Sequence, residues 1–329
     1  MTVKMEKKKE KLKFAFYWAA SCGGCEIAVL DINEKILEVV ELADVVFWPV
    51  AMDIKYKDVE NMPDKSIDVC FFNGAIRTEE NERMAKVLRK KAKTLIAFGS
   101  CACQGGIPGL ANISDRKEIF EKIYLQTFST KNPRAVTPKT LFKAKEGNLT
   151  LPTFYDTVKT LDQTVEVDYY IPGCPPPADL ILKAMEAIAK NELPPKGSVL
   201  APVKSVCDEC PYKKEEKRIS EIKYIHEVTP EPEKCFLEQG IICMGPATRA
   251  GCGATCIKAG MPCTGCGGPC PNEPEQGAAM LSALASVLGI DQEQEGFDVK
   301  KLIDQIRDPL GTFYMYSLPA SILRRKVKK

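Results

Sequence analysis

The sequence predicts an α/β fold: a doubly wound parallel sheet followed by a smaller, loop-rich region. Apolar runs alternate with helical patterns over the first 190 residues, and such alternation indicates a parallel sheet covered by helices. A proline-rich segment at residues 191–202 ends this pattern. Nine of the fifteen cysteines then follow between Cys207 and Cys270. A chain of 329 residues is long enough for two such domains.

The elements of the first part follow from short apolar runs and amphipathic segments. Strands are predicted at residues 13–20, 44–51, 67–76, 93–100 and 165–173, and helices at 26–43, 78–92 and 178–190. The first helix is expected to use apolar positions near helical spacing: Ile27, Leu30, Ile36, Leu37, Val40 and Leu42. The helix from Thr78 begins with acids and ends with lysines, which is the charge order that the helix dipole favours.

The remaining segments are less regular. Residues 111–165 contain scattered prolines and are predicted to form an inserted helix with long connections. Beyond residue 202, glycines and prolines surround every cysteine, so metal–thiolate bonds are expected to replace much of a hydrophobic core there. A last helix is predicted near residues 275–290.

Composition narrows the functional class. The formal net charge of +2 leaves no overall basic footprint for nucleic acid. No signal peptide is visible, and the longest apolar stretch, residues 278–290, is too short to span a bilayer. These features predict a cytoplasmic protein without a membrane span, whose reduced cysteines serve metal binding or catalysis rather than disulfides.

Four cysteines follow predicted strands of the sheet. Cys22 and Cys25 lie after the first strand, Cys101 follows the run LIAFGS, and Cys174 follows VDYYIPG. The carboxyl ends of parallel strands meet at one edge, where ligands bind. Four thiolates there match the ligand count of a [4Fe–4S] cluster, and the N-terminus of the helix after Cys25 is expected to stabilise the cluster's negative charge.

Other interpretations of these cysteines are weaker or open. Cys22-x2-Cys25 alone is typical of a thioredoxin-type redox pair, but the motifs at Cys101 and Cys174 argue against it. Cys70, inside a predicted strand, is expected to be an inert buried thiol. Cys103 lies two residues after Cys101, so one of the two must be spare.

The second part holds nine cysteines, and eight of them are candidate ligands. These cysteines are Cys207, Cys210, Cys235, Cys243, Cys252, Cys256, Cys263 and Cys266. They suffice for two tetra-cysteine sites, but their spacing does not separate zinc from iron–sulfur. Cys270 is expected to be a free thiol. The single histidine, His226, has no neighbour at ligand spacing and is predicted to be a surface or partly buried residue.

Five motifs in order place the chain beside a known family. YWAASCGGCEIAVLD, GSCACQGG, YIPGCPPP, CMGPATRAGC and MPCTGC together resemble the small, electron-transferring subunit of [NiFe] hydrogenases. The resemblance covers nearly the whole chain and is strongest to the cytoplasmic, methyl-viologen-reducing type that works with heterodisulfide reductase. It implies a flavodoxin-like domain over residues 1–195 and a C-terminal iron–sulfur domain over residues 196–329.

The resemblance also implies three [4Fe–4S] clusters. By motif, the proximal cluster, nearest the partner's active site, is bound by Cys22, Cys25, Cys101 and Cys174. The medial cluster is bound by Cys252, Cys256, Cys263 and Cys266, and the distal cluster by Cys207, Cys210, Cys235 and Cys243. Cys207 stands where many relatives have histidine. Many relatives lack the fourth medial thiolate and hold [3Fe–4S]; here Cys256 is the expected fourth ligand and Cys270 its competitor.

The implied function is electron transfer, with no catalytic residue in this chain. A [NiFe] large subunit splits H2, and the electrons leave toward an iron–sulfur subunit and the heterodisulfide reductase complex. A deazaflavin- or NAD(P)-reducing hydrogenase is the near alternative, and a zinc-stabilised binding module is the alternative of a different class. Glu26, beside Cys25, is a possible proton relay, although an acid at a helix N-terminus is the favoured interpretation.

Overall fold

The computed structural model describes residues 11–215, 219–273, 275–288 and 299–326. Its central sheet has five parallel strands in the order β2-β1-β3-β5-β9. Their bounds are β1 Leu12–Trp18, β2 Ala43–Phe47, β3 Ile67–Asn73, β5 Ala92–Phe98 and β9 Tyr169–Ile171. Counted along these strands, the order is 2-1-3-4-5, that of flavodoxin-like doubly wound sheets. The predicted α/β fold is confirmed.

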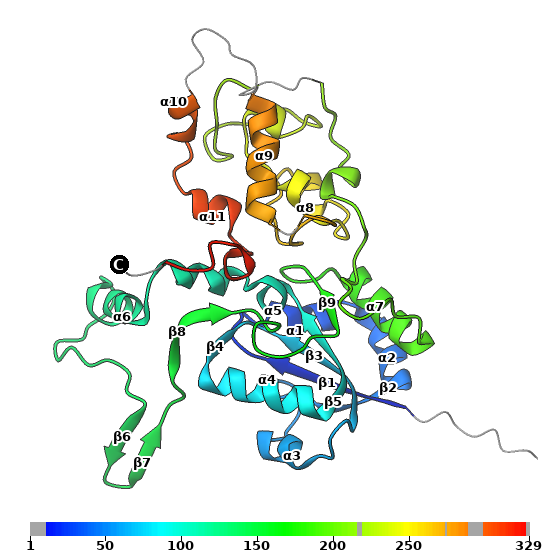
Figure 1. Ribbon diagram of the computed structural model, residues 1–329, viewed down its shortest axis with the longest axis vertical. Coiled ribbons are helices and arrows are strands. Elements are labelled where there is room, and N and C mark those ends of the chain that lie inside the picture. The colour runs from blue at the N-terminus through cyan, green and yellow to red at the C-terminus, as the bar shows by residue number, and fades with distance from the viewer. Residues whose placement is uncertain (1–10, 216–218, 274, 289–298, 327–329) are drawn as a thin grey trace, which may run out of the picture.

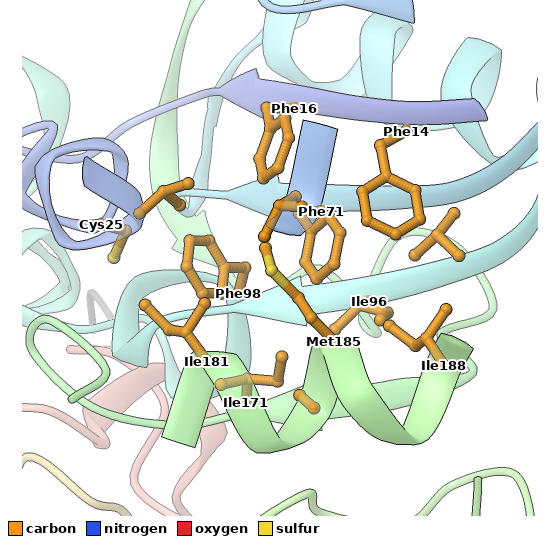
Figure 2. Close-up of a cluster of buried hydrophobic side chains, with 14 of the residues drawn as sticks. Phe14, Phe16, Cys25, Phe71, Ile96, Phe98, Ile171, Ile181, Met185 and Ile188 are labelled. Carbon is orange, nitrogen blue, oxygen red and sulfur yellow. The ribbon is translucent and has the colours of Figure 1, made fainter. Parts of the chain in front are cut away.

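Helices cover both faces of this sheet (Figure 1). One face packs against α1 (Gly24–Leu30), α2 (Ile36–Leu42) and α7 (Ala178–Lys190). Figure 2 shows this layer, in which Phe14, Phe16 and Phe71 of the strands lie over Met185 of α7. The other face packs against α3 (Tyr56–Asn61), α4 (Glu79–Lys91) and α5 (Ser100–Gln104). Since both faces are buried, the strands are continuous apolar runs in the sequence.

The single helix predicted over residues 26–43 is wrong. The chain forms α1 and α2, separated by a 3-10 turn at Asn33–Lys35. Asn33 adopts a left-handed conformation (φ 55°), and its amide donates to the Asp31 carbonyl at 3.0 Å, which replaces helical hydrogen bonding. The expected apolar face is also wrong at Ile27, Leu30, Leu37 and Val40, which are 58, 54, 64 and 44% exposed. Ala28, Val29 and Val39 are buried instead.

Residues 74–165 carry strands that were not predicted. Gly74 follows the end of β3 and has φ 99°. Only glycine fits there, because a Cβ would lie 2.8 Å from the Ala19 carbonyl carbon. The chain then forms β4 (Ile76–Thr78), which pairs with β8 (Phe154–Lys159) in an antiparallel ladder. Between them lie the predicted inserted helix, α6 (Arg116–Glu121), and a projecting hairpin of β6 (Leu141–Ala144) and β7 (Gly147–Thr150) (Figure 1).

The second part is loop-rich, as predicted, but it has a core of its own. Its helices are α8 (Thr255–Lys258), α9 (Gln276–Leu288), α10 (Val299–Ile303) and α11 (Pro309–Phe313). Phe236, Met244, Met280 and Leu284 are buried together there. Residues 289 and 290 of the predicted last helix lie outside the described residues. Within the described ranges, no helix combines the length and apolarity needed to cross a bilayer.

Candidate metal centres

The sheet brings Cys22, Cys25, Cys101 and Cys174 together. Cys22 precedes α1 and Cys25 lies in its first turn; Cys101 lies in α5 after β5, and Cys174 follows β9. Burial raises the pKa of the Cys25 thiol far above its ordinary value, and Cys101, Cys174, Cys103 and Cys22 raise it further. Burial also raises the pKa of Cys101 to about 12, with added repulsion from Cys174 and Cys22.

Every pair among these four thiols therefore interacts electrostatically, because the pKa of Cys174 is also raised by Cys22. Cys25 and Cys101 are buried, and neighbouring thiols that are shielded from water ionise together only with a positively charged group between them. Metal ligation requires thiolates and releases their protons. The donor set thus fits an iron–sulfur cluster, whose irons supply the missing positive charge.

Glycines leave room around these sulfurs. A Cβ on Gly99, where φ is 84°, would lie 2.3 Å from the Cys25 sulfur. A Cβ on Gly106 would lie 2.5 Å from the Cys101 sulfur. The backbone also contributes directly, since the Gly24 N–H donates to the Cys22 sulfur at 3.4 Å. Glycine at these two positions therefore avoids a clash with the Cys25 and Cys101 sulfurs.

Glu26 lies in the first turn of α1 but points into the protein. It is 5% exposed, and it accepts hydrogen bonds from the Trp48 indole and from the Asn73 amide. Burial raises the pKa of the Glu26 carboxyl, and these two donors partly offset the shift. The carboxyl is thus buried and accepts two hydrogen bonds, and it does not face solvent as a helix cap would. Its role in proton transfer stays a prediction.

A second group of thiols forms around Cys207. Burial raises the pKa of Cys207 to about 12, and Cys243, Cys235 and Cys210 all act on it. Burial likewise raises the pKa of Cys243 to about 11, while the Gly245 and Cys263 N–H groups lower it. A Cβ on Gly245 would lie 3.1 Å from the Cys207 sulfur. The same combination of close thiols and an open glycine position recurs here.

A third group centres on Cys266. Burial raises the pKa of Cys266 to about 11, and Cys252 and Cys256 raise it further. The pKa of Cys263 is also raised by burial, by Cys243 and by Cys266, so this thiol lies between the second and third groups. Its N–H donates to the Cys243 sulfur at 3.3 Å. Neighbouring groups of thiols are therefore in direct contact.

The remaining cysteines have other partners. The Cys270 thiol donates to the Pro246 carbonyl at 3.2 Å, and the charges acting on it come from Arg249, Glu273 and Asp208. Cys70 is fully buried in β3. Cys103 is buried, and its thiol donates to the Ala97 carbonyl at 3.3 Å.

His226 is far more exposed than these thiols. Its side chain is 66% exposed and faces Glu227. It also packs against the Tyr224 ring, with the ring centroids 5.7 Å apart. This agrees with the predicted surface position.

Several residues of the centres were missed in the sequence. The Ser100 hydroxyl donates to the Cys266 carbonyl at 2.5 Å, so the first and third groups are tied together. Thr264 and Tyr316 share a hydroxyl contact of 3.3 Å beside the third group. No periodic or motif signal marks Tyr316. Thr264 could have been suspected only from its place between Cys263 and Cys266.

Among the described residues, which include all fifteen cysteines, no three His, Cys, Asp or Glu side chains are grouped closely enough to hold one metal ion. A tetrahedral zinc site places four ligands about 2.0–2.3 Å from one centre. A cubane distributes its four thiolates over four irons and so separates them.

The fold and the thiol groups are those of an iron–sulfur protein of the oxidoreductase class. Residues 22–188 match the family described as NADH ubiquinone oxidoreductase, 20 Kd subunit. The iron–sulfur subunit of an F420-non-reducing hydrogenase from Archaeoglobus profundus is 43% identical over 97% of this chain and 99% of its own length. The corresponding hydrogenase subunit from Methanothermobacter marburgensis is 38% identical over 97% of this chain and 98% of its own length.

The chain belongs to the small, iron–sulfur subunits of F420-non-reducing hydrogenases. It is thus a hydrogenase subunit that pairs with a large subunit, and the predicted methyl-viologen-reducing family is confirmed. A solved [NiFeSe]-hydrogenase from Dm. baculatum also matches, with a TM-score of 0.49, 18% identity, and coverage of 79% of this chain and 95% of the other. A TM-score below 0.5 is too low to support the family assignment further.

Proposed function

We propose that this chain conducts electrons from H2 oxidation in the large subunit through three [4Fe–4S] clusters to a partner of the heterodisulfide reductase system. One observation carries the proposal: the three thiol groups form a contiguous series. The Ser100 hydroxyl, beside Cys101, donates to the Cys266 carbonyl at 2.5 Å, and the Cys263 N–H donates to the Cys243 sulfur at 3.3 Å. Electrons would pass from the proximal to the medial and then to the distal group.

The ligand assignment follows the thiol groups. Proximal ligands are Cys22, Cys25, Cys101 and Cys174; medial ligands are Cys252, Cys256, Cys263 and Cys266; distal ligands are Cys207, Cys210, Cys235 and Cys243. For the disputed fourth medial ligand, Cys256 is favoured because the competing Cys270 thiol donates to the Pro246 carbonyl. Residues 1–195 form the proximal-cluster domain and residues 196–329 the domain of the other two clusters.

The acceptor is inferred from the relatives. Their names describe hydrogenases that do not reduce F420, which favours an acceptor other than that deazaflavin. We therefore prefer an iron–sulfur subunit of the heterodisulfide route, in the cytoplasm, over a deazaflavin- or NAD(P)-reducing complex. The zinc alternative is disfavoured by the spread of the sulfurs over the described residues.

The proposal is tested on the native complex, purified without oxygen. Iron and acid-labile sulfide should each approach about twelve per copy of this chain, four per cubane, with a broad brown absorption. Mass spectrometry of the co-purifying subunits identifies the acceptor. A colourless protein with about two zincs would overturn the electron-transfer function, and a deazaflavin-binding subunit would overturn only the acceptor.

A further inference from the structure

The proximal and medial loops are in direct contact. Ser100, beside Cys101, donates its hydroxyl to the Cys266 carbonyl at 2.5 Å. The gap between the two centres is therefore set by how firmly these two loops are held together.

The C-terminal segment, residues 314–326, holds the proximal loop from outside. The Gly106 N–H donates to the Tyr316 carbonyl at 2.9 Å. The Pro319 ring fills the space beside Gly105, where a Cβ would lie 2.3 Å from it. The Gln163 amide donates to the Pro319 carbonyl at 2.8 Å. The segment is thus anchored on the α/β part at the loop that carries Cys101.

Tyr316 extends from this anchored segment into the medial loop. Its hydroxyl lies 3.3 Å from the Thr264 hydroxyl, between the medial cysteines Cys263 and Cys266. Tyr316 is half-buried. One residue therefore bonds the proximal loop through its backbone and the medial loop through its side chain.

We propose that Tyr316 is a positioning residue for electron transfer, which fixes the distance between the proximal and medial clusters. This inference rests on the proposed cluster assignment. Tyr316 is neither oxidised nor deprotonated in this role. Its ring excludes water from the junction, and its hydroxyl keeps the medial loop against the α/β part. Because tunnelling rates fall exponentially with distance, a small increase in the gap slows transfer measurably.

The test uses the complete hydrogenase complex with Tyr316→Ala and Tyr316→Phe. Reduced [4Fe–4S] clusters are paramagnetic, and the dipolar coupling between two of them falls with the cube of their separation. Pulsed EPR of the fully reduced complex should show a weaker or broader proximal–medial coupling in Tyr316→Ala. Electron transfer between the two clusters should be several-fold slower. Tyr316→Phe should give the same changes in smaller measure.

Tyr314→Phe is the matched control. It removes a hydroxyl from the same segment, but one for which the structure shows no hydrogen bond to the described cluster loops, and whose pKa burial and Glu275 raise. It should leave the coupling unchanged. Thr264→Val removes the Tyr316 contact from the other side, so the double variant Tyr316→Phe/Thr264→Val should change the coupling no more than either single variant.

The possible outcomes distinguish a failure of this inference from a failure of the proposed function. A wild-type complex without three clusters would overturn the proposed function. Full iron content with wild-type coupling in Tyr316→Ala, or strictly additive effects of Tyr316→Phe and Thr264→Val, would overturn only the role of Tyr316. If Tyr316→Ala loses the medial cluster, the role of Tyr316 is decided by whether the effects of Tyr316→Phe and Thr264→Val on the coupling are additive.

Discussion

The two parts of the molecule position their cysteines by different means. In the first part, the proximal thiols follow strands that are already held by hydrogen-bonded ladders; Phe98, for example, pairs with Ile171 in the sheet, and only Cys25 of the four belongs to the large apolar cluster on one face. In the second part, most thiols lie in loops or a short 3-10 turn, Cys256 lies in the one-turn helix α8, and Cys243 and Cys263 are members of the buried core. We therefore expect the first part to keep its fold without a cluster, and the second part to depend more on thiolate–metal bonds.

Iron removal should expose this difference most strongly. Anaerobic chelation should remove most amide hydrogen-exchange protection from residues 235–266, because thiolate–iron bonds hold these loops. Strands β1, β3 and β5 should keep theirs. Equal loss of protection in both parts would show that the sheet also depends on its cluster.

Blocking the proximal site should remove one cluster and spare the other two. Gly99→Ala places a Cβ 2.3 Å from the Cys25 sulfur, so iron should fall by about four atoms per chain. Gly197→Ala is the matched control, since its φ of 88° is similar and nothing lies within 4 Å of a Cβ there. It should cost about 1 kcal/mol of backbone strain and keep all the iron. Equal iron in both variants contradicts the proximal site.

Changing one ligand of the second part should convert a cluster rather than abolish it. Cys256→Pro should turn the medial centre into a three-iron cluster, visible by EPR in the oxidised complex, because three thiolates remain. Cys270→Ser should leave all spectra unchanged, since that thiol bonds Pro246. The reverse result would make Cys270 the fourth ligand.

A change far from any thiol group should affect only stability. Asp168 is 1% exposed and accepts from the Leu95 N–H, Arg89 and Lys196 at 2.8, 2.6 and 2.6 Å. Burial acts to raise the pKa of this carboxyl, but these partners hold it below its usual value. Asp168→Asn should lower the free energy of unfolding by about 1–3 kcal/mol, measured by denaturant titration, without iron loss.

The pH dependence of this contribution has a defined sign. Because the folded pKa of Asp168 is depressed, its stabilisation is fully present above the unfolded value of about 3.9 and is lost as pH falls through the folded pKa. The wild-type and Asp168→Asn proteins should therefore converge in stability in acid. A constant difference down to low pH would contradict the ionised state of this carboxyl.

The sequence predicted the sheet, and the edge of the sheet at which the proximal cysteines meet, because both follow from local patterns in the chain. Continuous apolar runs mark buried strands, and parallel strands bring Cys22, Cys101 and Cys174 to one edge whatever the intervening loops do. The helix over residues 178–190 matches α7 in both bounds. By contrast, Asn33 broke a helix that periodicity favoured, because a single left-handed residue outweighs apolar spacing.

What the amino-acid sequence by itself determined is the family, the parallel sheet and the identity of the thiols, since each is written in short motifs and local patterns. Only the tertiary structure decided which thiols touch, that Cys270 is turned away toward Pro246, and that Gly99 leaves space beside Cys25. It also decided that Tyr316 reaches between two loops. These are contacts between distant segments without regular secondary structure, and no periodicity along the chain encodes them.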